Sequence, residues 1–278
     1  MTDDLASFAR LVQAIAPWRV HLVLVGGWAH RLHRLHQLAG VPRYQPLTTK
    51  DTDLAFDTRA PLEGDIKSAL AKAGFKEELV GDFRPPATHY ALGDDDAGFY
   101  AEFLTPLIGS GVKRSGAPDA TVSKAGITAQ KLRHLEILLV SPWTIRVGPE
   151  QGIPLLKPLD LLVPNPTSFI VQKLLIRHER RAEKRAQDAL YIHDTLELFG
   201  GALEELNRLW ADVVQPQLSA KMARSALETA REAFTAVDDV LRDAARIPQD
   251  RALSPERLRA AAALALSEVL GIDIDVRK

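Results

Sequence analysis

Residues 20–27 read VHLVLVGG, and residues 49–54 read TKDTDL. The first run is apolar up to its two glycines and predicts a buried strand over Val20–Val25. The second run begins another strand, which we expect over Asp51–Phe56 because apolar residues follow the two aspartates. Between them, apolar residues at helical spacing predict a helix over Trp28–Leu38. The two runs therefore predict a strand, a helix, a proline-containing loop and a second strand.

The acidic pair Asp51 and Asp53 has the spacing that places both carboxylates on one face of a strand, because side chains alternate across it. Two carboxylates on one face can hold Mg²⁺ against a phosphate-bearing substrate. The diglycine Gly26-Gly27 lets backbone N–H groups approach phosphates where a Cβ atom would obstruct them. The combination predicts a site for phosphoryl transfer.

Glu102 is the candidate for a third carboxylate. It lies in the alternating run Phe99–Leu104, which with Thr88–Leu92 flanks a turn rich in Gly and Asp and predicts a hairpin. Such a hairpin could bring Glu102 beside Asp53, and three carboxylates on neighbouring strands would hold two Mg²⁺ ions. The alternative interpretation is that Asp51 and Asp53 merely begin a strand and Glu102 lies on a solvated sheet face.

The kind of secondary structure changes along the chain. Further predicted helices are Leu5–Ile15 and Leu62–Ala73, and further predicted strands are Trp143–Val147 and Leu155–Val163. Asn165 can cap a helix and Pro166 suits its first turn, and from there helical patterns continue to the end. We therefore expect an α+β fold, with a mixed sheet and flanking helices in residues 1–164 and a helical region in residues 165–278. The hairpin argues against a doubly wound parallel sheet.

Composition excludes several classes of site. The 278 residues contain no cysteine, which excludes disulfides, thiolate zinc sites and cysteine nucleophiles. The net charge is -1, so any site for a polyanion must be local. Neither a signal peptide nor an apolar run of membrane-spanning length is recognisable. We expect a cytoplasmic protein that does not enter a membrane.

The segment after Asn165 contains a basic stripe. Its members are spaced by four, four, three and four residues: Lys173, Arg177, Arg181, Lys184 and Asp188. On one continuous helix they would share a face, which could neutralise the β- and γ-phosphates of a nucleotide or contact an RNA backbone. The alternative is a solvated, salt-bridged helix face.

The run Gly26–Ala29 followed by Thr49–Leu54 resembles the signature of the DNA polymerase β-type nucleotidyltransferase superfamily. In that superfamily a Gly-Gly or Gly-Ser pair opens a helix and Asp-x-Asp follows on the next strand. More narrowly, the chain resembles the AbiEii-like bacterial nucleotidyltransferases, which have a later Lys, Arg and Lys-x-x-x-Asp block on a helix. The residues that match this later block are Lys173, Arg177, Lys184 and Asp188. The resemblance covers about residues 20–195.

The resemblance implies a Mg²⁺-dependent nucleotidyltransferase that moves a nucleoside monophosphate from an NTP to a hydroxyl or phosphate acceptor. The implied catalytic and metal-binding residues are Asp51, Asp53 and Glu102. The implied nucleotide-binding residues are Gly26, Gly27, Thr49, Lys50, Lys173, Arg177, Lys184 and Asp188. The acceptor is left open; the AbiEii-like pattern favours RNA or a protein in a toxin–antitoxin role, and the C-terminal helices leave room for a homodimer. The competing hypothesis is a regulatory protein of the same fold that binds nucleotide or RNA without turnover.

Overall fold

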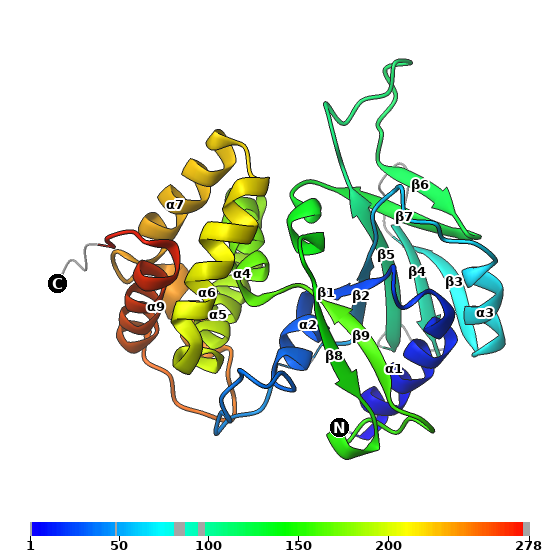
Figure 1. Ribbon diagram of the computed structural model, residues 1–278, viewed down its shortest axis with the longest axis horizontal. Helices are drawn as coiled ribbons and strands as arrows, with labels where there is room; N and C mark the ends of the chain where they lie inside the picture. Colours follow the sequence, from blue (N-terminus) through cyan, green and yellow to red (C-terminus); the bar gives the residue numbers. More distant parts are fainter. Residues whose placement is uncertain (1, 48, 81–86, 94–97, 275–278) are drawn as a thin grey trace. The chain divides into compact units, whose positions relative to one another are not determined.

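The computed structural model describes residues 2–47, 49–80, 87–93 and 98–274. Contacts divide the chain into two compact units, one formed by residues 1–35 and 48–164 and the other by residues 36–47 and 165–278. The first unit contains the sheet and the second is helical (Figure 1). The sequence also predicts a boundary at residue 164, but with residues 36–47 in the first region.

The first unit begins with a helix and then builds a sheet. Its helices are α1 (Thr2–Ala14), η1 (Ala16–Trp18), α2 (Gly26–His33), α3 (Ile66–Lys72), η2 (Leu135–Leu139) and η3 (Pro149–Gln151). Its strands are β1 (Val23–Val25), β2 (Asp51–Ala55), β3 (Phe75–Val80), β4 (Ala87–Leu92), β5 (Phe99–Pro106), β6 (Thr121–Lys124), β7 (Ile127–Leu132), β8 (Trp143–Val147) and β9 (Leu159–Val163).

The strands of the described residues form one nine-stranded sheet. The order is β3-β4-β5-β2-β1-β9-β8, and β7 pairs with the far end of β5 and with β6. The pairs β2–β5, β1–β9 and β5–β7 are parallel and the other pairs are antiparallel. This mixed sheet with flanking helices confirms the predicted α+β class. The antiparallel β4–β5 pair confirms the predicted hairpin, of which turn residues 94–97 lie outside the described part of the chain.

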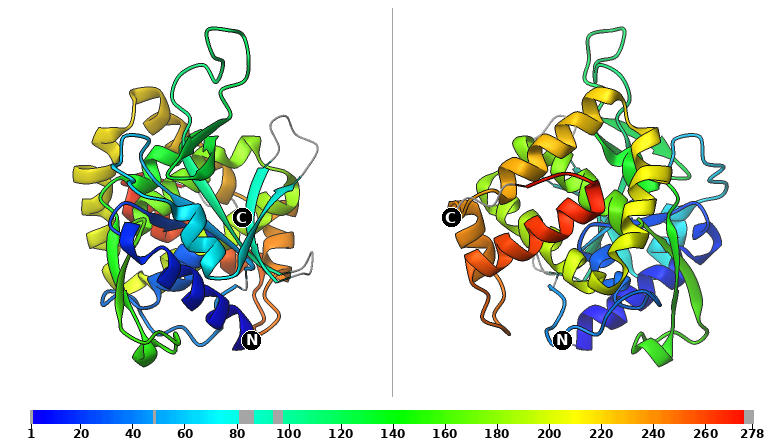
Figure 2. Two further views of the ribbon diagram at one scale, coloured as in Figure 1. Left: turned by 90° about the vertical axis from the view of Figure 1, so that its right-hand side faces the viewer. Right: turned by 60° about the vertical axis from the view of Figure 1, so that its left-hand side comes forward.

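One face of this sheet is buried under α1 and α3, which lie side by side on it (Figure 2). Phe8 of α1 stacks on Trp28 of α2 with ring centroids 3.9 Å apart, and Trp28 meets Phe99 of β5 edge to face at 6.1 Å. Ile66 and Leu70 of α3 are fully buried. These large apolar side chains form the main core of the unit, and their burial orients the strands.

Part of the opposite face is covered by apolar packing. Val23, Ala55 and Leu104 lie side by side on β1, β2 and β5, and the 3₁₀-helix η2 packs on them through Leu135 and Leu138. Because side chains alternate, the same face continues along β2 with residues of odd number. The aspartates of β2 therefore project from this face, next to the part on which η2 packs.

Several element boundaries differ from the predictions. The strand expected over Val20–Val25 is only the three residues of β1, and the helix expected over Trp28–Leu38 already ends at His33. Strand β3 was not predicted, because all of its side chains after Phe75 are exposed and show no alternation.

The second unit is helical throughout its named elements. They are α4 (Pro166–Ile176), η4 (Arg177–Glu179), α5 (Ala182–Leu198), η5 (Gly200–Ala202), α6 (Leu203–Arg208), the π-helix η6 (Leu209–Val214), η7 (Gln215–Gln217), α7 (Ala220–Phe234), α8 (Asp239–Arg246) and α9 (Pro255–Leu270). The Asn165 side chain caps α4 by accepting a hydrogen bond from Ser168 N at 2.8 Å, as the sequence predicts. Gly271 ends α9 in the left-handed conformation. Among the described residues, the helices are too short or too polar to traverse a bilayer.

Candidate active site

Register places the candidate carboxylates next to one another. β2 and β5 run parallel with Asp53 opposite Glu102 and Asp51 opposite Tyr100. Paired residues on neighbouring strands project from the same face, so the three carboxylates share one face of the sheet. They are partly buried there, whereas Thr52 on the other face of β2 is fully buried. The structure thus brings Glu102 beside Asp53, about fifty residues away in sequence.

Gly26 lies so close to the Asp53 carboxylate that only glycine fits at this position. Its φ of +65° lies in the left-handed region, and a Cβ atom there would lie 2.4 Å from the Asp53 Oδ2 atom. No side chain larger than hydrogen fits without displacing that carboxylate. Val25, which pairs with Asp53 across β1 and β2, supplies no side-chain cap to α2. The helix α2 therefore begins without a capping side chain at its N-cap residue.

Thr49 and Lys50 precede the acidic pair and differ in role. The Thr49 hydroxyl donates a hydrogen bond to the Asp51 carboxylate. The Lys50 side chain is exposed, and its carbonyl oxygen accepts a hydrogen bond from Tyr100 N at 3.2 Å. Thr49 therefore orients one carboxylate, whereas the backbone of Lys50 extends the pairing of β2 with β5.

His89 is a member of this face that the sequence analysis missed. It lies on β4 opposite Glu102, and its Nε2 atom is 2.6 Å from the Glu102 Oε1 atom. Its ring stacks on Tyr100 with centroids 4.3 Å apart. Neighbouring residues of a strand project from opposite faces, so His89 lies on the face opposite that of buried Tyr90. Its pairing with Glu102, however, depends on the register of the hairpin. That register was not readable from the turn sequence alone.

The surroundings of Glu102 and Tyr100 shift the pKa values of these two side chains. Burial raises the pKa of Glu102 above its usual value, and Asp51 adds to this rise while His89 opposes it. Burial and the charges of Asp51, Glu102 and Asp53 raise the pKa of Tyr100 to about 12. Tyr100 is therefore close enough to sense all three carboxylates, which together concentrate negative charge on this face of the sheet.

The carboxylates have the donor chemistry for Mg²⁺, which prefers oxygen ligands. Asp51 and Asp53 project from one strand and Glu102 from the neighbouring strand. They do not form a closed ligand set in the structure: within the described ranges, three potential ligand atoms lie within 4.8 Å of one another only at His193, Asp194 and Glu197. Asp51, Asp53 and Glu102 are the residues that would hold Mg²⁺, which would neutralise phosphate charge when bound.

The His193, Asp194 and Glu197 cluster of the second unit already contains a cation. Arg251 Nη2 lies 2.5 Å from Asp194 Oδ1, and Arg251 Nη1 lies 3.8 Å from Glu197 Oε2. His193 Nδ1 lies 2.9 Å from the same Asp194 oxygen. Two of the three potential ligands thus face a guanidinium group, which would oppose a metal ion at this position.

Lys173 and Asp188 form a buried ion pair in the second unit. Lys173 Nζ lies 2.5 Å from Asp188 Oδ1, and the two residues are 5% and 6% exposed. The ammonium group also lies 4.7 Å from the ring centroids of both Phe169 and Tyr191. Arg180 reaches the other Asp188 oxygen at 3.4 Å. Pairing and cation–π contacts together offset the desolvation of this lysine.

The single helix face predicted for the basic stripe does not form. Helix α4 ends at Ile176, a 3₁₀ turn follows, and α5 begins only at Ala182. Arg177 is buried in that turn with Asp238 at 3.8 Å, and burial lowers its pKa. Lys184 is exposed and donates a hydrogen bond to Gln187 at 3.3 Å. The basic stripe is therefore divided: Lys173, Arg177 and Asp188 form internal ion pairs, and Lys184 lies on the surface.

Comparison with known proteins gives a family match for this chain. The sequence profile of a family described as nucleotidyltransferase matches residues 3–215. All the candidate site residues from Gly26 to Glu197 lie in this range. A search of curated proteins finds no match. The family match covers most of the chain, and the diglycine, the acidic pair and Glu102 all lie within it. The chain belongs to this nucleotidyltransferase family.

Proposed function

We propose that the chain transfers a nucleoside monophosphate from an NTP to a hydroxyl or phosphate acceptor and requires Mg²⁺. In this reaction the acceptor oxygen forms a bond to the α-phosphorus, the bond from that phosphorus to the bridging oxygen breaks, and pyrophosphate leaves. The observation that carries the proposal is the group Asp51, Asp53 and Glu102 on one sheet face, with Gly26 making room for Asp53.

Asp51 and Asp53 are the proposed principal metal ligands, and Glu102 completes the site. Bound Mg²⁺ would neutralise triphosphate charge and stabilise the oxygens of the reacting phosphoryl group. Thr49 orients Asp51 through its hydroxyl hydrogen bond. Glu102 accepts the proton of an acceptor hydroxyl, a role that its raised pKa favours. His89 orients this carboxylate from β4.

The phosphate side of the proposed site lies at the start of α2. The N–H groups of Gly26 and Gly27 open this helix without a side-chain cap, and a helix N-terminus favours anions. Lys50 adds an exposed positive charge immediately before β2. These groups have the chemistry to hold the triphosphate while the carboxylates organise the reacting end.

We propose that the later block, Lys173, Arg177, Lys184 and Asp188, contributes to nucleotide binding, directly through one residue and indirectly through the other three. Lys184 is exposed and carries only a long hydrogen bond, so it is the member best suited to meet a phosphate directly. Lys173 and Arg177 are each engaged in an internal ion pair, and Asp188 is the partner of Lys173. We propose that these three act by holding the α4–α5 corner in shape.

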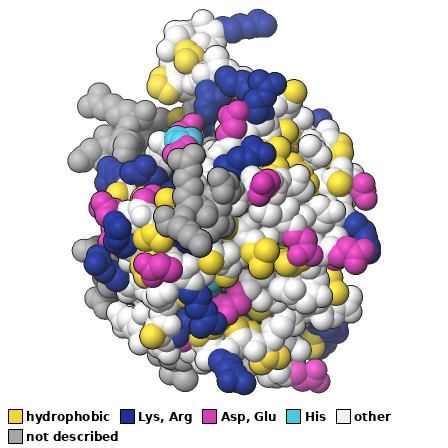
Figure 3. Space-filling model, turned by 90° about the vertical axis from the view of Figure 1, so that its left-hand side faces the viewer, with side chains coloured by type: hydrophobic (Ala, Val, Ile, Leu, Met, Phe, Trp, Pro, Cys, Tyr) yellow, Lys and Arg dark blue, Asp and Glu magenta, His cyan; other side chains and the backbone are white. Residues whose placement is uncertain are grey.

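The acceptor that we propose is RNA or a protein in a toxin-like role, following the AbiEii-like pattern. The net charge of -1 argues against broad nonspecific binding of nucleic acid. In Figure 3, basic and acidic side chains are interspersed on the face shown and do not form one extended basic patch. Recognition of an RNA acceptor would therefore be local.

The test is incorporation of label from each α-labelled NTP with Mg²⁺ and total cell extract, followed by separation of RNA, protein and small molecules. Asp53→Asn should retain the fold and reduce incorporation by at least about 100-fold, since it removes a proposed ligand of the Mg²⁺ that would stabilise the reacting phosphoryl group. The matched control is Asp57→Asn, two residues beyond β2, where the carboxylate pairs with exposed Arg59 at 3.1 Å. Unchanged incorporation in Asp53→Asn would refute the assignment. Mg²⁺-independent NTP binding without pyrophosphate release would indicate the non-catalytic binding protein instead.

A further inference from the structure

A cavity of about 390 Å³ lies wholly within the second unit, apart from the proposed catalytic face. Its walls come from residues 40–44, the end of α5, the loop before α9 and the first turn of α9. The apolar part of its lining includes Val41, Pro42, Leu198 and Leu253. A cavity of this volume is within the range of sites for small molecules.

The wall formed by residues 40–47 is attached at two points. Gly40 N donates a hydrogen bond to Leu198 O at 2.7 Å, and Gln45 N donates to Asp250 Oδ2 at 2.6 Å. Between them, the Tyr44 ring stacks on the Arg251 guanidinium, whose Cζ atom lies 3.4 Å from the ring centroid. The segment is therefore held as a formed wall by backbone and stacking contacts.

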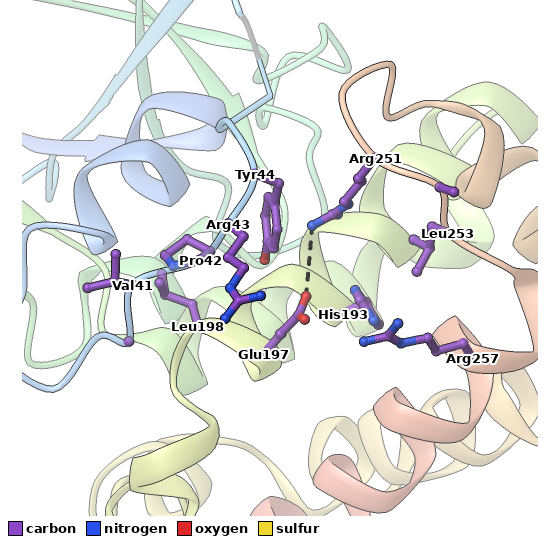
Figure 4. A pocket seen from close by; sticks show the side chains of 12 residues that line it. Val41, Pro42, Arg43, Tyr44, His193, Glu197, Leu198, Arg251, Leu253 and Arg257 are labelled. Carbon is purple, nitrogen blue, oxygen red and sulfur yellow. Dashed lines mark ion pairs between the residues drawn. The ribbon is translucent and has the colours of Figure 1, made fainter.

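Three arginines reach this pocket from different segments, around Glu197 (Figure 4). Arg251 is committed to Asp194, Glu197 and the Tyr44 ring. The guanidinium groups of Arg43 and Arg257 are exposed and make no ion pair or hydrogen bond among the described residues. The pocket lining thus has three arginines and one carboxylate, Glu197, and two of these arginines have no ion pair within the described part of the chain, so the lining favours an anion.

We propose that this pocket binds a phosphate monoester carried on an apolar or aromatic body, such as a nucleoside monophosphate, without a metal ion. Arg43 and Arg257 would contact the phosphate, since guanidinium groups match phosphate oxygens in pairs. Leu253, Pro42 and Val41 would contact the body of the ligand. Arg251 pairs with Asp194 and Glu197 and so reduces their repulsion of the anion, and it also opposes a metal at the His193, Asp194 and Glu197 cluster.

The experiment is calorimetric titration of the whole chain in EDTA with AMP, CMP, GMP and UMP, with inorganic phosphate and adenosine as partial ligands. At least one monophosphate should bind saturably and at least about tenfold more tightly than either partial ligand. Arg257→Glu and Arg43→Glu should each weaken that binding by about tenfold or more. Arg224→Glu, at an exposed arginine of α7, is the control for net charge. Both pocket arginines are exposed, so equal melting temperatures should confirm that these variants fold.

Asp53→Asn separates this inference from the proposed catalytic site, because the variant should bind the monophosphate as the wild type does. Absence of saturable binding would overturn the inference, as would binding that survives Arg257→Glu but is lost in Asp53→Asn. Equal affinity for inorganic phosphate would also overturn it, because the apolar wall would then contribute nothing. A saturable site for Mg²⁺, Mn²⁺ or Zn²⁺ that disappears in Glu197→Gln would show a metal centre in place of an anion pocket.

Discussion

Gly26→Ala is the substitution whose effect follows most directly from the geometry. The left-handed backbone at φ +65° costs a residue with a Cβ atom about 1–2 kcal/mol. The new Cβ atom would also lie 2.4 Å from Asp53 Oδ2, about 1 Å inside an ordinary contact, so the carboxylate must move by roughly that distance. A displacement of about 1 Å at a catalytic group can reduce the rate about 100-fold. We therefore expect a modest loss of stability and a large loss of activity.

Thermal unfolding should show a melting temperature about 2–8 °C below that of the wild type. The loss of activity should be the larger effect. It is measured as Mg²⁺–NTP binding by calorimetry and as pyrophosphate release with cell extract. The matched control is Gly152→Ala, where φ is +74° and nothing lies within 4 Å of the added Cβ atom. It should lose comparable stability and keep its activity. Adding Asp53→Ala to Gly26→Ala should restore part of the stability, because the clash is gone.

Two results would refute this reasoning. Wild-type activity in Gly26→Ala would mean that the position of Asp53 does not matter to the reaction. An equal loss of activity in Gly152→Ala would mean that backbone strain anywhere in the first unit is enough to impair the protein.

Two further predictions test the interior of each unit. Asp188→Asn should destabilise the chain by about 3 kcal/mol in urea unfolding, because it leaves Lys173 buried without its carboxylate. The control Lys184→Gln, at an exposed position, should change the free energy of unfolding by less than about 0.5 kcal/mol. Equal effects of the two substitutions would contradict a buried ion pair. Because the pKa of Tyr100 is raised to about 12, the folded chain keeps a proton that the unfolded chain releases from about pH 10 upward, so stability should fall between these values. Absorbance titration at alkaline pH measures the pKa of Tyr100 when the signal of the Tyr100→Phe variant is subtracted. In Asp51→Asn this pKa should fall towards the usual value of tyrosine. An unchanged pKa would mean that Asp51 does not lie near Tyr100.

The predicted elements that the structure confirms are those with a strong local pattern. Leu5–Ile15 has apolar residues at helical spacing and lies largely in α1, and Asn165-Pro166 begins α4 with the expected cap. Strand β3 carries no such pattern, because it is paired on one side only and exposed after Phe75. Its backbone hydrogen bonds to β4 make it a strand, and these are not visible in its own side chains.

The basic stripe shows why spacing alone is insufficient for a site. Positions three and four apart share a face only while the helix continues, and the helix is interrupted at Arg177–Glu179. Lys173 and Asp188 are fifteen residues apart and meet through the packing of α4 on α5. Whether a charged residue is a surface contact or a buried pair depends on that packing, which the sequence pattern does not contain.

The sequence by itself determined that Asp51 and Asp53 share a face, because strand geometry makes every second side chain point the same way. It also determined that the chain between Val25 and Trp28 could approach other groups closely, because two glycines lie there. Only the tertiary structure decided that Glu102 lies opposite Asp53 and that His89 lies opposite Glu102. Those neighbours depend on strand order and register, and both follow from burying apolar rows of distant segments together, a property of the whole sheet and not of any one segment.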